Sequence, residues 1–171
     1  RTDASSRFGK DADAGVKIGG VAWGLFPSIQ GAWVISNEDW FRMKGIDYLK
    51  LSAGFESVGN DGIDNSATLT YMSSAAMFNN GITSIGLTNI GNEGLRWETT
   101  NRFTAGIEGN FFNNRLNFSV DYFDKRTKDL LFRIAVDPAL GVDRTMVNGG
   151  SILNSGLEFE LGWKDQIGDF S

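Results

Sequence analysis

Several segments of this chain alternate apolar and polar residues with a period of two, which is typical of β-strands with two unlike faces. In residues 48–56 the apolar positions are Leu49, Leu51, Ala53 and Phe55. The same alternation recurs after Thr100, in residues 116–122 and in residues 157–163, and a noisier version covers residues 23–35. A helix would need apolar spacings of three and four, which these segments lack. We therefore expect an all-β fold of about six antiparallel up-and-down strands.

The connections between the expected strands are alternately short and long. Asn113 and Asn114 predict a tight hairpin turn, because asparagine tolerates positive φ. Residues 36–47 form another short link, which contains the one candidate helical turn, at residues 37–43, with Ser36 or Asn37 as its cap. Residues 58–94 and 132–152 are long and rich in Gly, Asn, Ser and Thr. Such loops are uncommon in soluble sandwiches, whereas outer-membrane barrels combine short periplasmic turns with long outer loops.

The polar positions of the alternation include charged side chains well inside the strands. They are Lys50, Glu56, Glu108, Asp121, Glu158 and Glu160. In a transmembrane barrel these residues would line a wet lumen while the apolar positions contact lipid. In a soluble sandwich or small barrel the same polar face would be exposed to solvent, so the alternation alone leaves both interpretations open.

Aromatic residues and the strand count both bear on this choice. Aromatic side chains flank the short links, as in the interfacial girdle of a membrane protein. They are Trp33, Trp40, Phe41, Tyr48, Phe111, Phe112 and Trp163. About six strands are too few for a closed membrane barrel, which needs at least about eight. Because open sheet edges in lipid leave backbone groups unsatisfied, we expect these residues to be part of a larger wall.

Composition removes most enzymatic interpretations. The 171 residues include neither Cys nor His, and 16 Lys and Arg against 21 Asp and Glu give a net charge of −5. Without Cys there is no thiolate nucleophile or Cys-based zinc site, and without His the usual general base and the commonest metal ligand are missing. An acidic chain without basic clusters also argues against binding to nucleic acid. Residues 60–65 lack the ligand positions and closing Glu of an EF-hand. We expect no enzymatic activity, no cofactor and no metal site, and we interpret Glu158 and Glu160 as water-lining rather than as a glycosidase pair.

Six blocks of sequence carry a family resemblance. They are RTDASSRFG (1–9), WGLFPS (23–28), YLKLSAGFESVGN (48–60), LRWETT (95–100), NRLNFSVDYFDKRTKDLL (114–131) and NGGSILNSGLEFEL (148–161). With these blocks, in this order, the chain resembles the barrel wall of SusC/RagA-type TonB-dependent outer-membrane transporters of the Bacteroidota. It departs from the family at Ala4, usually Gly, and at Ser52, often Arg. The extra segment 10–22 predicts a longer or irregular first hairpin.

The resemblance implies that residues 1–171 are part of a 22-stranded transmembrane β-barrel, with the plug and the TonB box outside this chain. It implies import of an oligomeric nutrient, a glycan or a peptide, across the outer membrane. The implied partners are a SusD-like surface lipoprotein, TonB acting through the plug, outer-membrane lipid and the remaining barrel strands. A soluble β-sandwich glycan-binding module and a passive outer-membrane porin are the alternatives.

The long loops are where we expect contact with cargo or with the lid lipoprotein, because loops carry specificity. They offer aromatic, thioether, amide and guanidinium groups suited to sugars or peptides. The candidates are Tyr71, Met77, Phe78, Asn79, Arg144 and Asn148. We interpret residues 7–9 and 26–28 as structural, with Pro27 marking a bulge or strand end. Gly31, Gly54, Gly106 and Gly162 are expected to relieve crowding in a curved wall.

Overall fold

The computed structural model describes residues 2–5, 16–18, 21–60, 62–76 and 83–165, and within these ranges the fold is all-β. The strands are β1 (Thr2–Ser5), β2 (Val16–Ile18), β3 (Val21–Val34), β4 (Ile46–Asn60), β5 (Tyr71–Ala76), β6 (Thr83–Asn89), β7 (Glu98–Phe111), β8 (Leu116–Lys128), β9 (Leu131–Ala135), β10 (Arg144–Asn148) and β11 (Ser151–Trp163). Short 3₁₀ helices are η1 (Ile35–Asn37), η2 (Asn65–Thr68) and η3 (Pro138–Leu140). No helix in these ranges is long and apolar enough to span a membrane.

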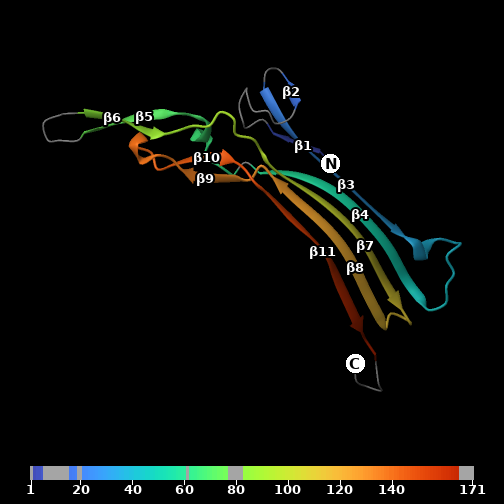
Figure 1. Ribbon diagram of the computed structural model, residues 1–171. Helices are drawn as coiled ribbons and strands as arrows, with labels where there is room; N and C mark the ends of the chain where they lie inside the picture. The colour runs from blue at the N-terminus through green and yellow to red at the C-terminus, as the bar shows by residue number, and fades with distance from the viewer. Residues whose placement is uncertain (1, 6–15, 19–20, 61, 77–82, 166–171) are drawn as a thin grey trace.

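The main sheet is an antiparallel meander in the order β1-β3-β4-β7-β8-β11, with the short β2 also paired to β3. Its five long strands run side by side in one curved layer (Figure 1). The expectation of about six up-and-down strands is therefore confirmed. Pro27 pairs with Thr2 of β1, while the ladder from β3 to β4 begins only at Ser28. Pro27 therefore lies inside β3 and not at the predicted bulge or strand end, but because proline cannot donate to a ladder, it stands where pairing with β4 ends.

The register places apolar positions opposite apolar positions, and polar positions opposite polar positions, on neighbouring strands. One row consists of Trp33, Leu51, Ile107, Val120 and Phe159. The next row consists of Ala32, Ser52, Gly106, Asp121 and Glu158. Because side chains alternate along every strand, the sheet has one continuous apolar face, which carries the first row, and one continuous polar face, which carries the second.

The apolar face is uncovered by the rest of the described chain. Ile29 is 74% exposed, Leu157 is 72% exposed and Phe159 is 67% exposed. The buried hydrophobic residues lie elsewhere, in a small cluster of Ala67, Leu95 and Trp97 among the loops. A soluble sandwich would pack its apolar stripes against each other in a dry interior. The exposed stripes contradict that alternative and fit a wall whose apolar face contacts lipid.

The short connections lie together at one end of the sheet (Figure 1). Between Phe111 and Leu116 the chain turns through residues 112–115, and Phe112, Asn113 and Asn114 have φ of 57°, 59° and 61°. The predicted asparagine turn is thus confirmed. The predicted helical turn at residues 37–43 is wrong, because η1 lies earlier and has no side-chain cap. In this segment Glu38 accepts a hydrogen bond of 2.8 Å from Nε1 of Trp33.

Aromatic rings cluster at this turn end. The ring centroids of Trp33 and Trp40 are 6.1 Å apart, and those of Phe111 and Phe118 are 5.4 Å apart and stacked. The backbone N–H of Phe112 donates to the carbonyl of Gly45 over 3.0 Å, which links the two short turns. The rings therefore form two aromatic groups, one beside each short turn, at the end of the wall where an interfacial girdle would lie.

The two long connections lie at the opposite end and are not structureless. Each contains a two-stranded hairpin, β5–β6 in the first and β9–β10 in the second, and both project from the wall on the same side (Figure 1). In the first hairpin of the chain, residues 16–18 pair with residues 21–23. The predicted irregular segment otherwise falls largely outside the described residues.

The two faces can be tested with the same substitution at adjacent positions. In the full-length receptor, we expect Ala53→Lys to lower the free energy of unfolding in lipid by about 2–4 kcal/mol, because it places a charge on the apolar face. Ser52→Lys, one residue away on the polar face, should have little effect. Denaturant unfolding in phospholipid vesicles measures both, and equal losses would contradict the assignment of one face to lipid.

Candidate functional site

All six charged residues predicted to line a lumen lie on the polar face. Lys50 is directly opposite Glu108, and Glu56 is directly opposite Arg102, across the β4–β7 ladder. Across the β8–β11 ladder, Asp121 is opposite Glu158 and Glu160 is opposite Ser119. The structure thus brings these side chains onto one surface.

Two ion pairs cross from β4 to β7 on this surface. Nζ of Lys50 lies 2.9 Å from Oε2 of Glu108, and a guanidinium nitrogen of Arg102 lies 3.4 Å from Oε1 of Glu56. All four side chains are about a third to a half exposed. Pairs at such sites contribute only about 0–1 kcal/mol to stability. Their main effect is to present alternating charges to the solvent along the wall.

Glycines on the polar face give room to neighbouring side chains. A Cβ on Gly106 would collide with the Asp121 carboxylate, and one on Gly54 would lie 3.1 Å from Oγ1 of Thr104. A Cβ on Gly162 would collide with the amide of Asn117. The predicted relief of crowding is confirmed for these three glycines. It is wrong for Gly31, where no atom lies within 4 Å of the Cβ position.

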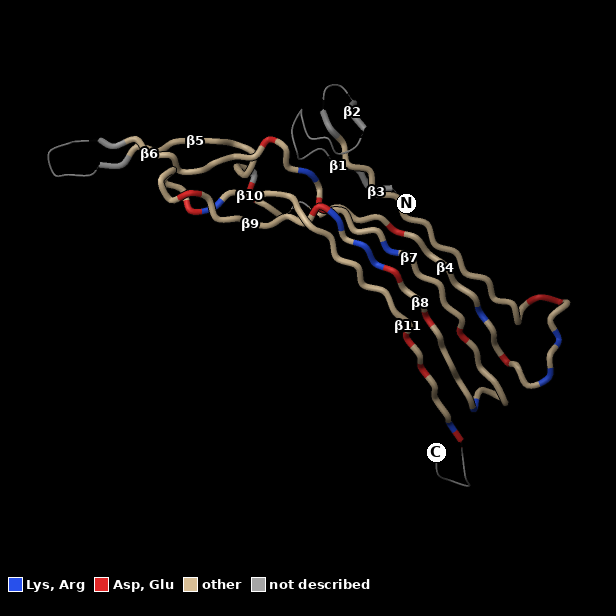
Figure 2. Tube along the Cα trace, in the orientation of Figure 1, with Lys and Arg blue, Asp and Glu red and all other residues tan. Residues whose placement is uncertain are grey.

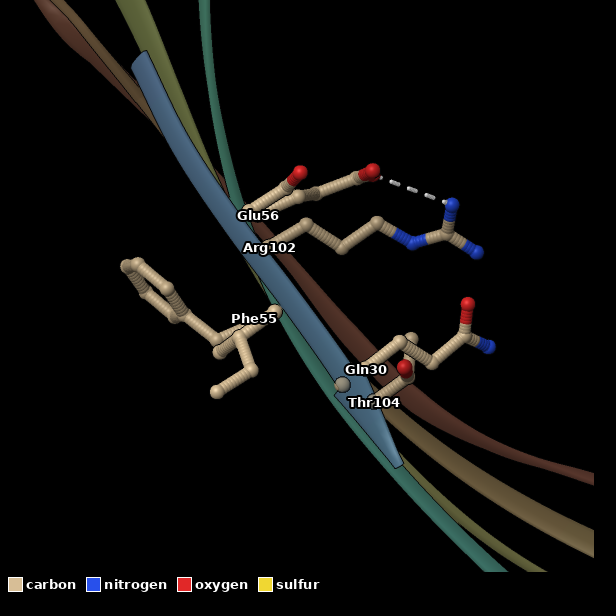
Figure 3. Close-up of a pocket in the computed structure, with 8 residues that line it drawn as sticks. Gln30, Phe55, Glu56, Arg102 and Thr104 are labelled. Carbon is tan, nitrogen blue, oxygen red and sulfur yellow. Dashed lines mark hydrogen bonds and ion pairs between the residues drawn. The ribbon is translucent and has the colours of Figure 1, made fainter. Parts of the chain in front are cut away.

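The polar face is hollowed near its loop end. Gln30, Thr104, Glu56 and Arg102 surround a hollow of about 280 Å³, while Phe55 points to the other side of the sheet (Figure 3). A neighbouring hollow of about 680 Å³ shares some of this lining. Its charged and aromatic lining includes Glu56, Arg102, Asp121, Phe123, Lys125 and Glu158. We refer to this second hollow as the wall hollow.

Phe123 is a site residue that the sequence analysis missed. It occupies a polar-face position of β8, between Asp121 and Lys125, and it is half-buried. A Cβ on Gly156, its partner on β11, would lie 3.1 Å from Cζ of the Phe123 ring, so the ring lies against this glycine. The available signal was the interruption of the alternation by an apolar residue between two charged positions.

The two long loops are joined by side-chain hydrogen bonds to backbone groups. The Asn148 amide accepts from the backbone N–H of Arg96 over 2.6 Å, and donates to the carbonyls of Arg96 and Asp129 over 2.9 and 2.8 Å. The Asn92 amide donates to the carbonyl of Met146 over 3.1 Å. Asn148, predicted to contact cargo or lid, therefore has its amide engaged in holding the second loop to the first.

A small apolar core supports this junction. Leu95 is fully buried and Trp97 nearly so, and Phe26, Leu131 and Met146 pack against them. The rings of Phe26 and Trp97 meet edge to face with centroids 5.5 Å apart. Because these residues come from β3 and from both loops, the loop base is a packed unit with the wall.

A cavity of about 450 Å³ opens between the two loops. Tyr71 from the first loop and Arg133 and Arg144 from the second line it. Two of the predicted outer-loop contact residues, Tyr71 and Arg144, are thus brought to one cavity. Met77, Phe78 and Asn79 lie outside the described residues.

The junction can be tested through Asn148. In the full-length receptor, we expect Asn148→Ala to lower the free energy of local opening in residues 90–97 and 131–148 by about 1–3 kcal/mol, because it removes three hydrogen bonds to backbone groups, of which the one to the Asp129 carbonyl is partly buried. Hydrogen exchange measures this change. Asn101→Ala, on the apolar-face side of β7, is the matched control. Unchanged exchange in Asn148→Ala would contradict the structural role.

Comparison with known proteins places this wall in a family. The family model for the TonB dependent receptor-like β-barrel matches residues 1–171. A TonB-dependent receptor of Formosa agariphila is 34% identical over 165 residues, covering 96% of this chain and 15% of the relative. The TonB-dependent receptor SusC of Bacteroides thetaiotaomicron is 31% identical over 172 residues, covering 96% of this chain and 16% of the relative. The chain therefore spans about a sixth of the length of the relatives it matches.

Solved structures agree with this placement. The RagAB peptide importer in its closed-closed state matches with a TM-score of 0.79 and 25% identity, covering 98% of this chain and 18% of that one. A structure of the RagAB peptide transporter matches with a TM-score of 0.78 and 26% identity, covering 98% of this chain and 18% of that one. With its two-faced antiparallel wall and a family match over its whole length, the chain belongs to the TonB-dependent receptor β-barrels of the outer membrane and is of the SusC/RagA type.

Proposed function

We propose that this chain forms part of the wall of a TonB-dependent importer that carries an oligomeric nutrient, a glycan or a peptide, across the outer membrane. The observation that carries the proposal is the two-faced sheet, whose apolar face is exposed in continuous rows while charged rows occupy the other face. On this proposal the apolar face contacts lipid. Lys50, Glu56, Glu108, Asp121, Glu158 and Glu160 line the lumen, and the chain has no enzymatic role.

The wall needs strands from elsewhere in the receptor. In hydrocarbon an open sheet edge leaves backbone N–H and C=O groups unsatisfied, each at a cost of several kcal/mol. The outward edges of β1 and β11 have no further strand among the described residues. We assign the closure of the barrel to the remaining strands of the full receptor, in a barrel of 22 strands, and energy coupling to a plug engaged by TonB.

The outer loops are assigned to cargo and to a SusD-like lipoprotein lid. The similarity to SusC and to the RagAB importer supports this assignment. Tyr71 and Arg144 lie on the cavity between the loops, where a ligand has access. Met77, Phe78 and Asn79 stay candidates for the same contacts. Asn148 contributes by holding the loops together rather than by offering a free amide.

A passive porin would share the two-faced wall, so the energy requirement distinguishes the two functions. We expect uptake of labelled oligosaccharides or oligopeptides by cells that make the full-length receptor to stop when a protonophore dissipates the proton-motive force. Cells lacking the receptor gene, and a small solute that enters through porins, are the controls. Receptor-dependent uptake that continues after the protonophore is added would identify a passive channel instead.

A further inference from the structure

Two pairs of like charges face each other across the strands of the polar face. Arg102 on β7 is the direct partner of Lys125 on β8, and Asp121 on β8 is the direct partner of Glu158 on β11. All four side chains line the wall hollow. Like charges directly opposite each other destabilise a sheet, so the arrangement needs an explanation other than the stability of the wall.

The protein itself compensates these charges only weakly. Within the part of the chain that the structure describes, the side chains of Lys125, Asp121 and Glu158 form no hydrogen bond or ion pair, although Asp121 has a longer-range electrostatic interaction with Lys50. Arg102 reaches Glu56 at 3.4 Å, with both side chains about half exposed. The hollow therefore holds a cationic pair and an anionic pair whose charges the described residues compensate only in part.

The two pairs are separated along the strand direction. Lys125 and Asp121 are four residues apart on the same face of β8, which places them about 13 Å apart. Cations of β7 and β8 lie toward the loops, and the acidic residues of β8 and β11 lie toward the turns (Figure 2). The Phe123 ring lies midway between the pairs, against Gly156. The wall hollow thus has one end where two cations, Arg102 and Lys125, face a single carboxylate of Glu56, another end with two carboxylates, and an apolar surface between them.

We propose that the wall hollow is a binding subsite for a zwitterionic oligopeptide of about four residues. Its carboxylate lies against Arg102 and Lys125, its ammonium group lies against Asp121 and Glu158, and an apolar side chain lies on Phe123. An extended chain of four residues spans about 13 Å, which matches the separation of the charged pairs. This inference rests on the proposed import function and specifies a peptide as the cargo.

Other oligomers match the hollow less well. A neutral glycan has no charge with which to relieve either like-charge pair. A glycan carrying acidic groups along its length would meet Arg102 and Lys125 favourably but would be repelled by Asp121 and Glu158. Gln30, Thr104 and Asn154 also line the two hollows and supply hydrogen-bonding groups for peptide amides.

The test is a binding comparison with end-blocked peptides on the purified full-length receptor at low salt. Tetra-alanine with free ends, its N-acetyl form, its C-terminal amide and maltotetraose are titrated by calorimetry. We expect the free peptide to bind about threefold to fivefold more tightly than either blocked form, because each block removes one exposed charge interaction. Maltotetraose should bind more weakly than the free peptide.

Two variants test which side chains bind the carboxylate and which bind the ammonium group of the peptide. Lys125→Gln should reduce affinity for the free peptide by about the same factor and leave the C-terminal amide unaffected. Glu158→Gln should reduce the affinity for the free peptide by a similar factor and leave the affinity for the N-acetyl form unaffected. Lys128→Gln, three residues from Lys125 and on the other face of β8, and Asp39→Asn, in the turn at the far end of the wall, are controls of equal charge change that should leave all affinities unchanged.

The proposal is overturned if free and blocked peptides bind equally, if none of them binds, or if maltotetraose binds more tightly than the free peptide. It is also overturned if the control variants weaken binding as much as Lys125→Gln and Glu158→Gln, since that would indicate general charge attraction. Energy-dependent uptake of glycans without peptide binding would reject the peptide subsite alone. Peptide binding with uptake that ignores the protonophore would reject the import mechanism alone.

Discussion

A strand in the hydrocarbon of a bilayer must satisfy its backbone groups through its neighbours, and its side chains then alternate between lipid and water. In this protein the ladders from β3 to β11 meet both requirements together, because the register places apolar positions opposite apolar ones and polar positions opposite polar ones. A slip of one residue would carry Glu108 or Asp121 into lipid and Phe103 or Val120 into water. The register is therefore the constraint on which the wall, its hollows and its charged rows all depend.

The wall has no conventional hydrophobic core, and its loop end is held by a small cluster of buried residues and by side-chain hydrogen bonds. The buried apolar residues of the described chain lie where β3, the first loop and the second loop meet, around Leu95 and Trp97. Asn148 and Asn92 complete this junction by bonding to backbone groups of the partner loop or strand. Loops anchored in this way hold Tyr71 and Arg144 beside one cavity at a fixed position above the wall.

Charged residues on the polar face are not all arranged in pairs that would stabilise the sheet. Between β4 and β7 opposite charges face each other, whereas between β7 and β8 and between β8 and β11 like charges do. Exposed opposite pairs contribute little to stability, and like pairs subtract from it. The proposed peptide subsite accounts for these like-charge pairs, which the stability of the sheet does not.

The alternation by itself determined the strands, the two faces and the six charged positions on the polar one, because a period of two is a local property of each segment. Asn113 and Asn114 likewise specified their turn locally. The candidate helical turn at residues 37–43 is wrong, because the 3₁₀ turn η1 lies earlier, at Ile35–Asn37, and Glu38 bonds back to Trp33 on β3. Only the tertiary structure decided that Asn148 joins the loops, that Phe123 lies against Gly156 and that Arg102 faces Lys125 while Asp121 faces Glu158. These relations join residues 23 to 52 positions apart in the chain, and they depend on the register between strands, which no single segment contains.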